Sequence, residues 1–426
     1  MILYLLILVI LLTVFFVSPA KGILLTVITQ PTISLFRAGG HDYSVDAVMA
    51  FVALIYLIIN HRKYFSKRNS VCPFLIGLFF SFISYFISGL YNGQAKLPIL
   101  LWMNCYDYIL VLCLYYIYKP TKSNNKFLFS LIFIYSAILI IYGIQEAITA
   151  ENPVIQYLYN IGMIRITQTD DYIRFGLYRA QSLTIWVSSF GTFCCFALVF
   201  LLLCAYKGII KFNLRIYLLA PFLIVSVFLT GGRTIMVMTA IALMSLIPYF
   251  YKRPRYIIFF AVLVIAFIYN NPDYVSELAD SFINPDDAGG SSITGRQWQL
   301  LAALSYYYDS PIIGNGINFI NEVQNQSSDI LGAESIIYKT LVDRGNLGII
   351  TLVILYANIF YVLIKKKLYF LCFLPLAFAF GKTASLLPGQ TEVYVLFWII
   401  ILLKLYDTQI PNGNDRYRKD LRQIYK

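Results

Sequence analysis

The residues best suited to chemistry in this chain are a set of arginines and one glutamate. The arginines lie beside apolar segments or within a long polar stretch, residues 271–344, and they are Arg174, Arg179, Arg233, Arg296 and Arg344. A guanidinium group is planar, stays charged and binds phosphate through two parallel hydrogen bonds. The set therefore predicts a site for a phosphate-bearing substrate, with all five arginines as candidate ligands.

Arg233 has the least ordinary position, because it follows Thr-Gly-Gly in a tight turn between two apolar segments. A charged side chain deep in the hydrocarbon region costs on the order of 2.5–3.5 kcal/mol and is retained mainly where it has a function. We predict that Arg233 is a catalytic or ligand-binding residue. The alternative is that its side chain reaches the nearby interface without binding substrate. Arg174 and Arg179 lie five residues apart, which does not place both on one helical face, so one of them can be structural.

Glu334 lies where the polar stretch gives way to an apolar helix. A carboxylate there could act as a general base on a hydroxyl group, since apolar surroundings would favour the uptake of a proton. The simpler alternative is that Glu334 stabilises the helix N-terminus through the helix dipole. The sequence leaves both roles open, and we predict a catalytic one.

The remaining ionisable residues offer little further chemistry. Asp107 lies inside an apolar segment and could belong to a proton path, but we favour structural pairing with Arg233 or with a neighbouring helix. The two histidines, His41 and His61, lie outside the polar stretch. We therefore expect no metal at the site, and no cofactor is required.

The composition shows which kind of fold must position these residues. Apolar residues make up 59% of the chain and charged residues 13%, and the mean hydropathy is +0.72, well outside the range of soluble domains. The apolar segments are long and uninterrupted, as transmembrane helices require, and lack the alternation of a membrane β-barrel. The fold class predicted is an all-α polytopic membrane protein.

Twelve apolar segments could span a bilayer, and they form one integral membrane domain over residues 1–426. The largest loop, residues 271–344, precedes the tenth segment, and residues 406–426 form a basic tail. The predicted spans are residues 2–18, 44–60, 71–90, 98–117, 127–147, 183–206, 212–230, 233–251, 256–270, 345–364, 368–383 and 391–405.

Charge in the connecting loops predicts the orientation. Clusters such as Arg62–Lys63, Lys252–Arg253 and Lys365–Lys367 occur on every second loop, and cytoplasmic loops are the ones enriched in lysine and arginine. Both termini are then cytoplasmic, and the polar stretch 271–344 is external. The segment 22–36, broken by a proline, could instead be a short span, which would place the N-terminus outside. The net charge of +12 thus reports orientation and does not indicate nucleic acid.

Several motifs occur in a characteristic order. They are Thr-Gly-Gly-Arg233-Thr, Gly-Arg296-Gln-Trp298, Pro311-Ile-Ile-Gly-Asn-Gly316 and Glu334-Ser, followed after nine residues by Gly345-Asn-Leu-Gly348. Together with the helix pattern they resemble the O-antigen polymerase and O-antigen ligase superfamily of bacterial inner membranes. The ligase branch has a histidine at the position of Glu334. The glutamate of this chain at the position of that histidine favours the polymerase over the ligase.

The resemblance implies a glycosyltransferase of lipopolysaccharide biosynthesis that works at the periplasmic face of the inner membrane. Its donor would be an undecaprenyl-diphosphate-linked oligosaccharide, and its chemistry would be metal-independent, inverting transfer to a sugar hydroxyl. By the motifs, Arg179, Arg233 and Arg296 would bind diphosphate or glycan, and Glu334 would orient or deprotonate the acceptor. Membrane lipid is a further expected partner, and a chain-length regulator protein is a candidate one.

Two other functions remain open. An O-antigen ligase would use the same donor but transfer the glycan to the lipid A core. A flippase for lipid-linked oligosaccharides would also need many helices, but such transporters usually show repeat symmetry, which this sequence does not display.

Overall fold

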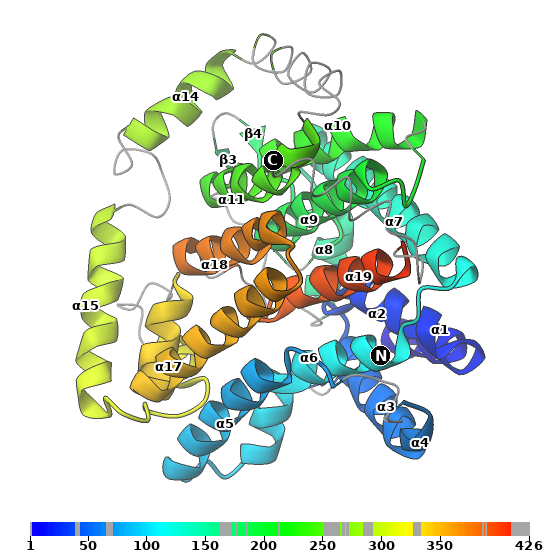
Figure 1. The fold of residues 1–426 in the computed structure, drawn as a ribbon. Helices are drawn as coiled ribbons and strands as arrows, with labels where there is room; N and C mark the ends of the chain where they lie inside the picture. Colours follow the sequence, from blue (N-terminus) through cyan, green and yellow to red (C-terminus); the bar gives the residue numbers. More distant parts are fainter. Residues whose placement is uncertain are drawn as a thin grey trace, which may run out of the picture.

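The computed structural model is a bundle of helices with two minimal β-hairpins (Figure 1). It describes residues 2–38, 43–64, 71–161, 173–174, 177–184, 186–211, 214–250, 265, 269, 272–283, 293–326, 334–385, 387 and 390–409. The predicted ninth span, residues 256–270, lies almost wholly outside the described residues, as does most of the predicted tail 406–426.

The helices of the N-terminal half include those formed by the first predicted apolar segments. They are α1 (Ile2–Val17), α2 (Pro19–Ile33), α3 (Val45–Ile59), α4 (His61–Tyr64), α5 (Leu75–Tyr91), α6 (Leu97–Ile117), α7 (Lys122–Thr149), α8 (Pro153–Asn160) and α9 (Val187–Tyr206). The hairpins pair β1 (Arg37–Ala38) with β2 (Tyr43–Ser44) and β3 (Ile173–Arg174) with β4 (Leu177–Tyr178).

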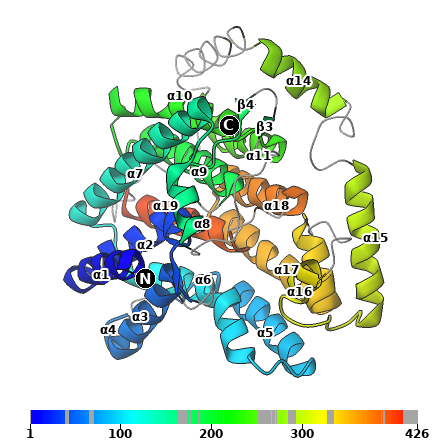
Figure 2. The same ribbon diagram turned by 180° about the vertical axis from the view of Figure 1, so that it is seen from behind.

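The C-terminal half continues the bundle and adds three helices within the polar stretch. Its elements are α10 (Leu214–Leu229), α11 (Arg233–Leu243), η2 (Met244–Leu246), α12 (Ile247–Phe250), α14 (Pro272–Ile283), α15 (Ile293–Asp309), α16 (Phe319–Gln326), α17 (Ile336–Lys365), η3 (Tyr369–Cys372), α18 (Phe373–Ser385) and α19 (Tyr394–Gln409). In both views of the ribbon, α14 and α15 lie along the edge of the bundle (Figures 1 and 2).

Among the described residues, four helices are long and apolar enough to cross a membrane: α6, α7, α9 and α17. Six shorter apolar helices coincide with further predicted spans, and they begin at residues 2, 45, 75, 214, 233 and 369. The all-helical membrane fold is thus confirmed, whereas the count of twelve spans and the side of each loop stay predictions. The segment 22–36 belongs largely to α2, which keeps Pro31 inside the helix.

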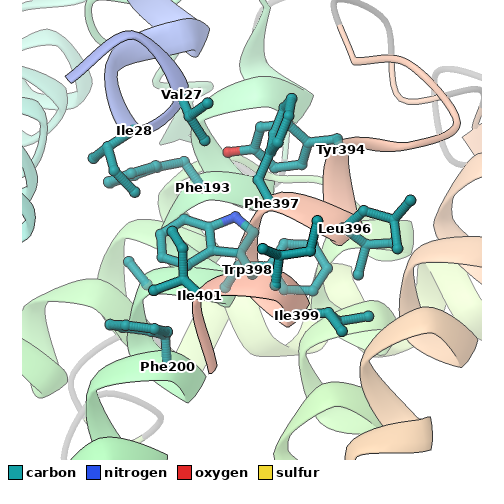
Figure 3. Packing of buried hydrophobic residues seen from close by; sticks show 14 of the residues in the cluster. Val27, Ile28, Phe193, Phe200, Tyr394, Leu396, Phe397, Trp398, Ile399 and Ile401 are labelled. Carbon is teal, nitrogen blue, oxygen red and sulfur yellow. The ribbon is translucent and has the colours of Figure 1, made fainter. Parts of the chain in front are cut away.

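The centre of the bundle is formed by helices that are apolar on all sides. Such helices have no polar face to present outward and are therefore buried. Helix α9 is almost entirely enclosed, and on α19 the side chain of Trp398 packs against Phe193, Phe196 and Phe200 at ring distances of 5.4–6.4 Å (Figure 3). This aromatic core fixes α9 against α19 and so supports the ends of the helices that carry the polar residues.

Candidate active site

The turn between α10 and α11 is bound by one of the predicted arginines and is followed directly by another. The side chain of Arg179 donates a hydrogen bond from Nε to the carbonyl of Thr230 at 3.0 Å. The backbone of Ala180 also donates to the carbonyl of Leu229 at 2.9 Å. Arg233 is the first residue of α11, directly after this turn, so Arg179 binds the backbone of the segment that leads into Arg233.

Helix α14 covers the same turn. Tyr274 donates a hydrogen bond from its hydroxyl to the carbonyl of Phe228 at 2.8 Å, and Arg233 donates to the carbonyl of Ser281. Arg296, near the start of α15, lies close enough to Arg233 for their charges to repel each other. The two guanidinium groups concentrate positive charge beside this turn, and such a concentration suits an anionic ligand.

Glu334 precedes α17 and is linked to the helix that carries Arg296. Its backbone N–H donates to the side-chain oxygen of Gln299 at 3.2 Å, and Gln299 follows Arg296 by three residues on α15. Residues three apart share a helix face. Capping of α17 is performed by Ser335, whose hydroxyl accepts from the N–H of Ile337. The carboxylate of Glu334 is therefore not needed as the cap.

Helix α17 is bent at Gly345, where φ is 59° and ψ is −154°. The bend releases backbone groups from the helix, and the segment 311–316 binds them. Asn315 and Gly316 donate to the carbonyls of Val342 and Asp343 at 2.9 and 3.1 Å. In return, the N–H groups of residues 346 and 347 donate to the carbonyls of residues 311 and 312. Two glycine motifs that are distant in the sequence thus form one backbone junction.

Arg344, the residue before the bend, is only 2% exposed and forms an ion pair with Glu392 at 3.1 Å. Its guanidinium also donates to the hydroxyls of Ser84 and Thr340 and lies 3.9 Å from the ring centre of Tyr85. These contacts already use most of its donors. Substrate binding by Arg344 stays a prediction, and the contacts favour a role in holding the site together.

Asp107 belongs to a second buried polar group on the same side of the bundle. Its carboxylate accepts from the side chain of Gln30 on α2 and from the hydroxyl of Thr391, both at 2.6 Å. The predicted pairing with a neighbouring helix is confirmed, but the partner is Gln30 and not Arg233. Because Thr391 precedes Glu392, Asp107 also fixes the segment that pairs with Arg344.

A cavity of about 140 Å³ lies between these groups. Its wall comes from α5, α6, the first turns of α17, the end of α18 and the segment before α19. Ile336, two residues after Glu334, belongs to the wall. All of these helix ends face the side that the loop charges predict to be external, the same side as the arginine turn.

The structure brings together Arg179, Arg233 and Arg296, with Glu334 joined to this group through α15. Arg344 belongs to the neighbouring ion-pair cluster. Arg174 is described only as backbone, in β3 paired with β4, so its predicted role stays a prediction.

Three residues missed by sequence reasoning line the cavity: Lys382, Gln390 and Glu392. The charges among them sit beside apolar segments, which is a recognisable signal of function.

The apolar helices and the polar cluster at their ends define a multi-pass membrane protein with an arginine-rich site at one end of the bundle. Residues 216–353, from α10 to the middle of α17, match the family model described as O-Antigen ligase. The match confirms the resemblance to the O-antigen ligase and polymerase superfamily, and it includes Arg233, Arg296, Glu334 and Arg344. No curated protein matches the chain.

Proposed function

We propose that this protein polymerises undecaprenyl-diphosphate-linked O-antigen repeat units at the periplasmic face of the inner membrane. The observation that carries the proposal is the convergence of Arg179, Arg233 and Arg296 on one turn, with Glu334 held beside the helix of Arg296. A diphosphate becomes a good leaving group once its charge is neutralised, and arginines can supply that neutralisation without a metal.

In the proposed reaction, a hydroxyl oxygen of the acceptor sugar attacks the anomeric carbon of the donor. The bond from that carbon to the diphosphate oxygen breaks, the lipid diphosphate leaves, and Glu334 takes the proton of the hydroxyl. Attack from the face opposite the diphosphate inverts the configuration. Arg233 and Arg296 bind the charge that develops on the leaving diphosphate, while Arg179 holds the turn in place and contributes further positive charge.

Glu334→Gln tests the assignment of the base. The amide keeps the shape of the side chain but takes up no proton, so transfer should fall by about 10²–10⁴-fold. The measurement is complementation of a strain lacking the gene, with the lipopolysaccharide ladder resolved on a gel at equal membrane abundance of the protein. Glu322→Gln on α16, an exposed acid in the same stretch, is the matched control and should retain the ladder. A full ladder with Glu334→Gln would refute the assignment.

The second candidate is an O-antigen ligase, which the description of the matching family favours. The same deletion strain separates the two functions. Loss of a polymerase leaves the core with one repeat unit, whereas loss of a ligase leaves the bare core. The glutamate at position 334 favours the first outcome.

A further inference from the structure

The cavity beside the ion pair of Arg344 and Glu392 is lined by polar groups whose hydrogen-bonding capacity is not filled by the described residues. Lys382 is 3% exposed, and its ammonium donates one hydrogen bond, to the carbonyl of Gln390 at 2.6 Å. Within the described part of the chain, Lys382 forms no ion pair. An ammonium has three donors, and a buried charge is costly unless it is paired. Lys382 therefore has donors available to an anion in the cavity.

Gln390 is the second such group. Its side chain is 7% exposed and lines the same cavity, and both its amide oxygen and its amide nitrogen lack a hydrogen-bond partner among the described residues. Buried polar side-chain atoms are hydrogen-bonded in the large majority of cases. The amide presents one acceptor and one donor group side by side. A ligand that binds both must therefore be able to donate and to accept hydrogen bonds.

The charges around the cavity define the ligand further. The positive side chains are Lys339, Arg344 and Lys382, and the negative ones are Asp343 and Glu392. The surplus of one positive charge matches a ligand with one negative charge. A diphosphate carries more charge and offers only acceptors, so it would leave the oxygen of Gln390 unbound. A hydroxyl group donates and accepts, and satisfies both ends of the amide.

The size of the cavity limits its ligand to part of a single sugar unit. The cavity measures about 140 Å³, and a cavity of roughly 150 Å³ holds benzene, which is smaller than a sugar ring with its substituents. We propose that this cavity binds part of one acidic monosaccharide unit of the glycan, with Lys382 pairing its carboxylate and the amide of Gln390 binding its hydroxyls. The inference rests on the proposed function, because it takes the substrate to be a glycan.

The test uses the full-length protein purified in detergent, with glucuronate, glucose and pyrophosphate as probes. Stabilisation against thermal unfolding reports binding to the folded state. Glucuronate should stabilise the protein at lower concentration than glucose, which lacks the charge, and than pyrophosphate, which lacks the hydroxyls. Lys382→Met should weaken glucuronate binding by about tenfold or more, the loss expected for one charge-assisted hydrogen bond. Gln390→Met, of similar shape, should weaken glucuronate and glucose alike.

The controls are Lys365→Met and Gln156→Met, which remove an exposed lysine at the opposite end of α17 from the cavity and an exposed glutamine on α8, which does not line it. Both should bind glucuronate like the unmodified protein, and Lys382→Arg, which keeps the charge, should retain the preference over glucose. Tighter binding of pyrophosphate than of glucuronate, or unchanged glucuronate binding in both cavity variants, overturns the inference. Dependence of the lipopolysaccharide ladder on Glu334 would still hold in that case, so failure of the cavity assignment is distinguishable from failure of the proposed function.

Discussion

At the scale of single residues, the site divides its charges between two tasks. Arg233 and Arg296 bring two positive charges close together beside the turn, whereas Arg344 is committed to Glu392, Ser84 and Thr340. The first arrangement suits an anionic substrate, and the second suits a fixed framework. Residue type alone did not separate these tasks, because both use arginine.

The ion pair of Arg344 and Glu392 should be strongly coupled. Glu392→Gln leaves a buried arginine without its counter-charge and should cost about 3–5 kcal/mol of stability. Replacing both residues, as in Arg344→Met with Glu392→Leu, should cost much less than the sum of the single changes. A double-mutant cycle on unfolding in detergent measures this coupling.

The chain supplies its own comparison, since Lys366 and Asp407 form an ion pair of similar length, 2.9 Å, on the exposed surface. Exposed pairs contribute roughly 0–1 kcal/mol. If Asp407→Asn costs as much as Glu392→Gln, burial does not govern the inner pair and the framework role of Arg344 is wrong.

At the scale of elements, the bend of α17 determines where Arg344 points. Gly345 adopts φ of 59°, and a Cβ there would lie 2.7 Å from the backbone nitrogen of Gly314. At Gly314, with φ of 82°, a Cβ would lie closer still, 2.3–2.5 Å from backbone atoms of residues 343 and 344. Only glycines permit the two segments to approach, and this approach supplies the hydrogen bonds that the bend releases.

Gly345→Ala should therefore destabilise the protein through both strain and overlap. Gly93→Ala is a matched control, because Gly93 also has φ of 59° but a Cβ there meets nothing within 4 Å. The control should cost roughly 1–2 kcal/mol, the price of a left-handed backbone for a residue with a Cβ, and Gly345→Ala should cost distinctly more. The free energy of unfolding in detergent is the measurement, and equal losses would show that the junction tolerates a side chain.

At the scale of the whole molecule, the orientation of the protein in the membrane determines on which side the candidate site lies. The predicted external ends of α5, α6, α11, α17 and α18 carry the arginine turn, the residues next to Glu334 and the wall of the cavity. The loops at the other ends carry lysines and arginines, which the positive-inside rule assigns to the cytoplasm.

Single cysteines should report this orientation in a background without the native seven. Glu151→Cys and Asn321→Cys lie at exposed positions of the predicted external loops and should react with a membrane-impermeant maleimide in spheroplasts. Lys122→Cys and Lys367→Cys, exposed on the opposite loops, should react only after the membrane is opened. Labelling of the second pair in intact spheroplasts would place the candidate site on the cytoplasmic side and contradict the proposed function.

The sequence by itself determined the membrane class, the ends of most helices and the stretch that holds the motifs, because hydropathy and charge are local properties that each segment displays alone. It also singled out Arg233, Arg296 and Glu334. It did not predict that Arg344, expected in the external loop, is buried within α17.

Only the tertiary structure decided which of these residues meet. The docking of residues 311–316 on the bend at Gly345, the pairing of Arg344 with Glu392 and the unused polar groups of Lys382 and Gln390 all join segments from different helices. The physical reason is that contacts between helices depend on how their faces pack in three dimensions, and no periodicity within one segment records its neighbours.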